Sequence, residues 1–194
     1  MVMPKPNVKE QLVATSLSLL HSKGFNATSV QDITTAAGVP KGSFYNHFAS
    51  KEALGLEVLQ RYSEGAARLA SALHDTSLSP LGRIQQYFHD YIESNAALDF
   101  NCGCLLGNFS TELSNQVPAI RQEMRIAFSK SSGALAGVIA EGQRDGSIAA
   151  THTAAELADF VVDAWQGAVL RSKAEHSREP LDRYARVVLG RILV

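Results

Sequence analysis

The stretch GVPKGSFYNHFASKEAL, from Gly38 to Leu54, places basic, aromatic and small polar residues between two segments of helical spacing. Upstream of it, Ser29 can cap a short helix that Gly38 ends, and Pro40 suits the first turn of the next helix. Two short helices joined by a glycine-containing turn, after a longer first helix, are typical of a helix-turn-helix. The pattern therefore predicts a helix-turn-helix in the first quarter of the chain.

The aromatic and polar residues of this stretch divide into two groups. Phe44 and Phe48 are four positions apart, so we expect them to fill the small core of this region. The polar residues can meet phosphate, because their side chains donate hydrogen bonds or carry positive charge and a helix N-terminus attracts anions. A plain surface helix would explain the phenylalanines but not the shared polar surface. We predict a phosphate-facing surface with Lys41, Tyr45, His47 and Lys51.

Composition limits the other possibilities. The chain has 194 residues, 45% of them hydrophobic, which is enough for a substantial core in one or two domains. A net charge of −1 argues against a chain that coats nucleic acid or membrane, but residues 1–51 hold five lysines against Glu10 and Asp32. No leader-like or membrane-spanning run is present, so we expect a cytoplasmic protein without a membrane partner. The two cysteines, in CGC at 102–104, predict reduced thiols.

The rest of the chain also shows the residue spacing and the start signals of helices. Apolar residues recur at helical spacing in each segment, and Ser79, Pro118, Thr153 and Pro180 mark helix starts. No segment has the alternating pattern of a strand. The sequence therefore predicts an all-α fold, with the helix-turn-helix in residues 1–50 and further helices over residues 51–194.

Residues 24–54, GFNATSVQDITTAAGVPKGSFYNHFASKEAL, resemble the N-terminal domain of TetR-family repressors, and the resemblance covers about residues 7–60. It departs from the family pattern at Thr35, where alanine is usual, and Asn46 occupies a variable position. The resemblance implies DNA contacts, mostly to the backbone, by Lys41, Gly42, Tyr45, His47 and Lys51. It also implies phosphate contacts by Thr28 and Ser29, and it makes Ser43, Asn46 and Gln31 the candidates for base edges.

One helix-turn-helix with so few basic residues binds weakly, whereas two copies about 34–36 Å apart can read a palindrome. We therefore expect a homodimer on double-stranded operator DNA. The resemblance also implies about nine helices, with a DNA-binding domain over residues 1–50 and an effector-binding and dimerisation domain over residues 51–194. The last two helices are apolar on much of their circumference, and in TetR-like proteins these helices pair with their symmetry mates. The predicted interface is Val161, Trp165, Ala168, Leu181, Tyr184 and Val188. Burial of these residues inside one chain is the alternative.

The middle helices carry aromatic residues that can line an effector pocket in a protein of this family. The candidates are Tyr91, Phe109, Phe128 and Trp165, with Tyr87, Phe88 and Phe100 nearby in the sequence. Each of them can equally be an ordinary core residue. The sequence does not encode the identity of the ligand.

Metal, cofactor and catalytic chemistry find little support. CxC is too tight for the usual pair of zinc ligands and has no second pair, and His89 and Glu93 read better as a solvated pair than as metal ligands. There is no Walker loop and no Ser/His/Asp constellation. We predict a bacterial regulator that is not an enzyme and has no metal or cofactor. The alternatives are a thiol-dependent redox enzyme and a helical small-molecule-binding protein that does not bind DNA.

A second resemblance concerns Gly103-Cys104-Leu105, the FSTEL stretch that follows, and WQGAVLRSKAEHSREPL. These resemble TetR-family repressors that sense electrophiles or oxidants. The resemblance implies that Cys104 is the sensor and that Lys173 lies near it, and a thiol beside an ammonium at a helix start is more reactive. The alternatives are an inert buried cysteine and a noncovalent effector. Cys102 has no family counterpart, although it can resolve a sulfenic acid on Cys104.

Overall fold

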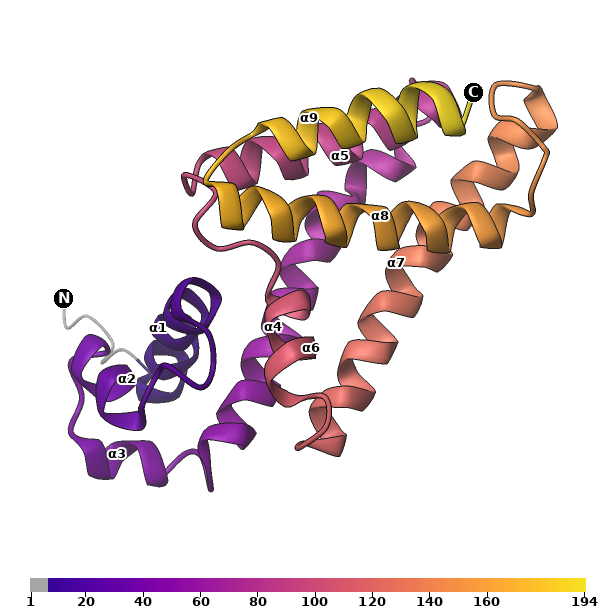
Figure 1. The fold of residues 1–194 in the computed structure, drawn as a ribbon. Coiled ribbons are helices and arrows are strands. Elements are labelled where there is room, and N and C mark those ends of the chain that lie inside the picture. The colour runs from indigo at the N-terminus through magenta and orange to yellow at the C-terminus, as the bar shows by residue number, and fades with distance from the viewer. Residues whose placement is uncertain (1–6) are drawn as a thin grey trace, which may run out of the picture. The chain divides into compact units, whose positions relative to one another are not determined.

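A computed structural model describes residues 7–194, and these form helices with no β-strand among them, which confirms the all-α prediction (Figure 1). Within the described residues, no helix is long and apolar enough to cross a membrane. Helix α9 continues directly into a π-helical segment, η2. The elements are α1 (Val8–Lys23), α2 (Val30–Ala36), α3 (Lys41–Tyr45), α4 (Lys51–Leu69), η1 (Ala70–His74), α5 (Pro80–Ala96), α6 (Leu105–Leu113), α7 (Pro118–Asp145), α8 (Ala154–Glu175), α9 (Glu179–Tyr184) and η2 (Ala185–Ile192).

Several helices begin where their local sequence predicts. The hydroxyl of Ser29 accepts a hydrogen bond from the Asp32 N–H, while the Asp32 carboxylate accepts one from the Ser29 N–H, so the two form a capping box for α2. Thr153 and Glu156 form the same arrangement at α8. Ser79 caps α5 through the N–H of Gly82. These hydrogen bonds lower the pKa of Asp32 and Glu156, because they favour the ionised carboxylates.

The chain packs as two compact units whose boundaries differ from the predicted division at residue 50. Of the described residues, the first unit contains those up to Ser63 together with Leu105–Met124, and the second contains Glu64–Cys104 and Arg125–Val194. The reason is local packing. At Gly55, α4 comes so close to Phe25 that an added Cβ would lie 3.0 Å from its ring, so the first half of α4 belongs to the helix-turn-helix core.

The core of the first unit includes both phenylalanines that the sequence assigned to it. Phe44 is completely buried, Phe48 is almost so, and their ring centroids lie 5.7 Å apart. Apolar residues of α1, α2 and α4 complete this core: Leu12, Val13, Leu20, Ile33, Leu54 and Val58. The short helix α3 is therefore fixed through its inner face.

The second unit is centred on aromatic side chains from α5, α8 and α9. The ring of Phe88 lies 5.1 Å from both Trp165 and Tyr184, and the Tyr184 hydroxyl donates a hydrogen bond to the Val161 carbonyl at 3.1 Å. Burial raises the pKa of Tyr184 far above its ordinary value. These contacts form the hydrophobic core of this unit.

The residues predicted for the dimer interface take part in this packing. Five of its six residues are buried within the single chain, and Ala168 is half-buried, because α8 and α9 turn these faces toward each other and toward α5. A side chain already buried in its own chain has little surface left for a partner. The apolar residues that remain exposed on these last helices are Phe160, Leu170, Val187 and Val194.

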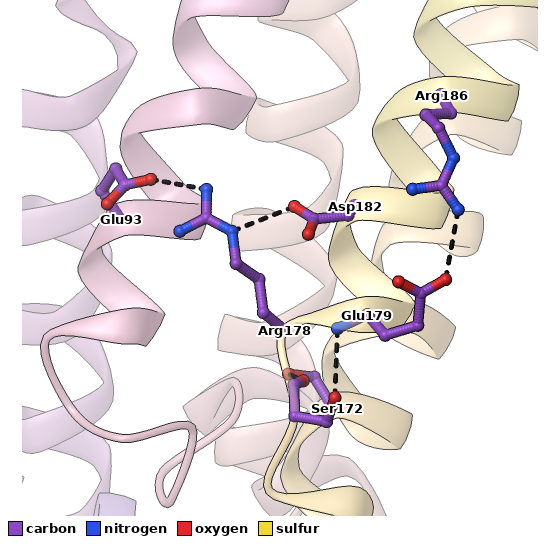
Figure 2. Close-up of polar contacts among 7 residues, drawn as sticks. Glu93, Ser172, Arg178, Glu179, Asp182 and Arg186 are labelled. Atoms are coloured by element: carbon purple, nitrogen blue, oxygen red, sulfur yellow. Dashed lines mark hydrogen bonds and ion pairs between the residues drawn. The ribbon is translucent and has the colours of Figure 1, made fainter.

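An ion-pair network fixes the corner where α9 follows α8 and packs beside α5. The Arg178 guanidinium donates to Glu93 at 2.6 Å and to Asp182 at 3.0 Å, while Arg186 pairs with Glu179 at 3.1 Å (Figure 2). The hydrogen bond from Arg178 lowers the pKa of Glu93. These residues are partly exposed, so the network specifies the geometry of the corner more than it adds stability. Glu93 is thus engaged by an arginine.

Candidate DNA-binding surface and effector region

Helix α3 has one buried side and one exposed polar side. Phe44 points into the core, whereas the neighbouring Tyr45 is 58% exposed and the side chains of Lys41, Asn46 and His47 are also exposed. The Tyr45 ring contacts Phe44 edge to face at 5.2 Å, which anchors the base of an otherwise open side chain. The structure therefore brings together four of the residues predicted to contact DNA.

The glycine in this helix has no internal explanation in the described part of the chain. A Cβ added to Gly42 would have no atom within 4 Å, so packing does not require the smallest residue here. Glycine inside a helix is less favourable than alanine by about 0.5–1 kcal/mol. The absence of a side chain leaves the backbone of α3 open to close approach from outside, while the adjacent Ser43 is half-buried.

Helix α2 adds two exposed polar residues to the same region of the sequence. Ser29 is exposed, but its hydroxyl is already part of the capping box that starts the helix. The exposed side chain of Gln31 donates from its amide nitrogen to the Thr35 hydroxyl at 3.2 Å. Gln31 therefore needs only to exchange one surface hydrogen bond in order to meet a base edge. Thr35, the departure from the family pattern, is the partner that holds it.

Two of the residues predicted to contact phosphate have hydrogen-bond partners inside the chain. Thr28 is completely buried, and its hydroxyl donates to the Gly24 carbonyl at 2.8 Å. The Lys51 ammonium donates to the carbonyls of Phe25 and Thr28, both at 3.0 Å, and lies 4.2 Å from the centroid of the Phe25 ring. Both side chains hold the turn between α1 and α2, which is a structural role.

The cysteine segment lies against the lysine that the resemblance pairs with it. Cys104 immediately precedes α6, and both cysteines are half-buried. Gly103 has φ +72°, and a Cβ added there would lie 3.0 Å from Cδ of Lys173, so the lysine stem packs on the backbone between the two thiols. Burial raises the pKa of the Cys102 thiol, and the nearby charge of Lys173 partly offsets this increase. The predicted sensor residues are thus neighbours.

The aromatic residues proposed for an effector pocket do not form one group. Tyr91 contacts Trp165 at 5.9 Å in the core of the second unit, and Phe128 packs partly buried against the same core. Burial raises the pKa of Tyr91, and a charge on Cys104 would raise it further, so the thiol is close to this phenol. Phe109 belongs to the first unit, where its ring meets Phe25 edge to face at 5.8 Å.

The second unit contains a groove that the sequence did not reveal. It lies between α7 and α8 and has a volume of about 460 Å³. Of the predicted pocket residues, Phe128 lines it, beside two carboxylates, Asp159 and Asp163, one helical turn apart on α8. Their i,i+4 spacing was visible in the sequence, but only the packing of α7 shows that they border a hollow. Among residues 7–194, no three His, Cys, Asp or Glu side chains gather as metal ligands would.

The fold and the exposed side of α3 define a helix-turn-helix regulator with a helical second unit. The bacterial regulatory proteins of the tetR family match residues 12–58, and the tetracyclin repressor-like C-terminal domain matches residues 80–188. The second match alone spans more than half of the chain. The chain belongs to the TetR family.

Individual relatives agree along the whole chain. The HTH-type transcriptional repressor DhaR of Mycobacterium sp. strain GP1 is 44% identical over 192 residues, which are 98% of this chain and 95% of that protein. A crystal structure of regulatory protein TetR from Rhodobacter sphaeroides gives a TM-score of 0.91 at 33% identity, covering 96% of this chain and 99% of that chain. The reduced form of E. coli NemR gives 0.81 at 27% identity, covering 96% and 98%.

The structural role of Lys51 makes a testable prediction. Replacing Lys51 by methionine keeps the length of the side chain but removes its hydrogen bonds to the carbonyls of Phe25 and Thr28, of which the Phe25 carbonyl still accepts from the Thr28 N–H. We expect a loss of about 1 kcal/mol or more in the free energy of unfolding, measured with urea. Lys41→Met, at an exposed lysine of α3, should change it by less than about 0.5 kcal/mol. Equal stability of the two variants would contradict the assignment.

Proposed function

We propose that the protein is a transcriptional repressor that binds a palindromic operator through α3 and acts as a two-fold dimer. The observation that carries this proposal is the division of the α3 region, in which Phe44 is buried while Lys41 and Tyr45 on the helix and His47, two residues after its end, are exposed. Lysine, tyrosine and histidine suit phosphate, and Asn46 suits adenine. Bound at a promoter, such a dimer represses by blocking access.

Dimerisation is assigned to the outer faces of α8 and η2. Phe160 and Leu170 on α8, with Val187 and Val194 near the C-terminus, keep about half or more of their surface exposed. Burying such side chains against a second copy is favourable by about 25 cal/mol per Å² of apolar surface. A dimer also supplies the second helix-turn-helix that a palindrome requires. Ala168, half-buried on α8, can border this interface.

The effector is assigned to the second unit, by one of two chemistries. An electrophile or oxidant would modify Cys104. The preceding residue, Gly103, is packed against the side chain of Lys173. A noncovalent small molecule would instead use the aromatic residues or the groove beside Phe128. The packing of Lys173 on Gly103 supports modification of Cys104, because it places this lysine beside the cysteine segment. The named relatives are transcriptional regulators, and we propose that this chain is likewise a cytoplasmic regulator and not an enzyme.

A thiol-dependent redox enzyme is the alternative from a different class. It would use Cys102 and Cys104 as a dithiol, with one residue between them. Burial raises the pKa of the Cys102 thiol, which makes it a poor nucleophile near neutral pH. The regulator explains the exposed polar side of α3, and the enzyme leaves it unexplained.

The operator proposal is tested by the salt dependence of binding. Lys41→Ala removes one phosphate contact from each half-site, so the slope of log K against log salt concentration should fall by about 2 for a dimer. Lys130→Ala, at an exposed lysine of α7 in the second unit, is the matched control and should keep the wild-type slope. Wild-type protein that binds its own upstream region no better than random DNA would refute the proposal.

The dimer is tested with Leu170→Glu, which places a charge on the exposed apolar face of α8. Because Leu170 is 66% exposed, the variant should fold normally, and light scattering should report a monomer with a sharply weakened operator affinity. Leu78→Glu is the control, since Leu78 is also exposed but lies in the loop before α5. A Leu170→Glu protein that remains dimeric would exclude this face.

The thiol chemistry is tested by treating the protein–DNA complex with N-ethylmaleimide. Wild type and Cys102→Ser should release DNA, and Cys104→Ser should retain it. Lys173→Ala should release DNA more slowly, because the thiolate loses a neighbouring cation. Equal release from Cys104→Ser would show that this thiol is structural and would favour the noncovalent effector.

A further inference from the structure

The turn between α1 and α2 is held from two sides by opposite charges. On its N–H side, the Glu112 carboxylate of α6 accepts hydrogen bonds from Phe25 at 3.1 Å and from Asn26 at 2.6 Å. On its carbonyl side, the Lys51 ammonium of α4 binds the oxygens of Phe25 and Thr28. Hydrogen bonds with an ionised partner are roughly twice as strong as neutral ones. The two charges together therefore fix the peptide groups of this turn.

Helix α6 contributes two more contacts to the same place. The side-chain amide of Asn108 donates to the His21 carbonyl at 3.2 Å, in the last turn of α1. The ring of Phe109 meets Phe25 edge to face. Asn108, Phe109 and Glu112 follow one another at helical spacing, so they share one face of α6. This face contacts the N–H groups of Phe25 and Asn26 and the ring of Phe25 in the turn, and the carbonyl of His21 at the end of α1.

Gly24 indicates independently that the turn is built around the carboxylate. Its φ of +90° is a conformation that other residues rarely adopt, and a Cβ added there would lie only 2.6 Å from Oε1 of Glu112. A larger residue at position 24 would both strain the backbone and displace the Glu112 carboxylate. The space beside Gly24 is thus occupied by Glu112.

We propose that Glu112 is a positioning residue for DNA binding, and this rests on the proposed operator function. By holding the N–H groups of Phe25 and Asn26, it sets the direction in which the chain enters α2, which begins at Val30. Helix α2 packs against α3, so the orientation of the DNA-facing side chains depends on a residue outside the helix-turn-helix. Glu112 lies in FSTEL, a stretch that the sequence analysis used only as a mark of resemblance.

The test compares wild type, Glu112→Gln, Glu112→Ala and Thr111→Ala. Glutamine keeps the shape of the side chain but turns an NH₂ group toward one of the two N–H donors. Thr111 is the matched control, because it is exposed on the same helix and its hydroxyl bonds to the Asn108 carbonyl of that helix. Operator affinity is measured well below the unfolding midpoint of every variant, and hydrogen exchange at the amides of Phe25 and Asn26 is measured without DNA.

Both Glu112 variants should bind the operator about tenfold more weakly or worse, and their Phe25 and Asn26 amides should exchange faster, while Thr111→Ala behaves as wild type. Variants with a lower unfolding midpoint but unchanged operator affinity of the folded protein would overturn the proposal, since Glu112 would then only stabilise the fold. Unchanged exchange in Glu112→Ala would overturn it as well. If that variant does not fold, Glu112→Gln carries the same comparison.

A failure of the proposed operator function gives a different result. In that case wild type itself shows no preference for its upstream DNA, whatever the variants do. The exchange rates of the Phe25 and Asn26 amides are measured without DNA, so they still decide whether Glu112 holds the turn.

Discussion

The burial of Phe44 is the contact on which the DNA-facing surface depends. A helix of five residues has too few hydrogen bonds to persist alone in water, so α3 keeps its shape only through its packing on α1 and α2. The buried Phe44 ring anchors α3, while Lys41 and Tyr45 on the helix and His47 after it are exposed. Lys51 and Glu112, which have opposite charges, bind the backbone of the turn between α1 and α2.

The predictions that succeeded rest on local chemistry. Ser29, Ser79 and Thr153 cap helices through backbone groups three residues away, so their role is visible in a short stretch of sequence. Phe44 and Phe48 follow the same logic, because their spacing of four residues predicted that both would enter one small core, and both are buried there. The family resemblance extended these local inferences to the fold of the whole chain.

The contacts that could not be predicted join residues distant in sequence. Lys51 binds carbonyls 26 and 23 residues away, and Glu112 binds N–H groups 87 and 86 residues away, so neither role can be inferred before the helices are packed. The burial of most residues predicted for the dimer interface has a related reason. Helix α8 is apolar on much of its circumference, and only packing shows that Trp165 faces inward and Leu170 outward. Periodicity identifies an apolar helix but does not say which side its own chain covers.

The cysteine segment and the turn-holding face are connected by a single short helix. Cys104 directly precedes α6, and Asn108, Phe109 and Glu112 lie within the next eight residues. Lys173 packs on Gly103, two residues before that helix. The two cysteines and the residue proposed to position the helix-turn-helix therefore belong to one continuous stretch of 11 residues, 102–112.

The central claim is that two copies of α3 read DNA with two-fold symmetry. It is tested most directly by footprinting the wild-type protein on the DNA upstream of its own gene. The account predicts a protected palindrome whose half-sites are centred about 10–10.5 base pairs apart, or a multiple of that spacing. Protection should disappear when either half-site is scrambled. Protection of a single asymmetric site, or none at concentrations that leave random DNA unprotected, would contradict the account.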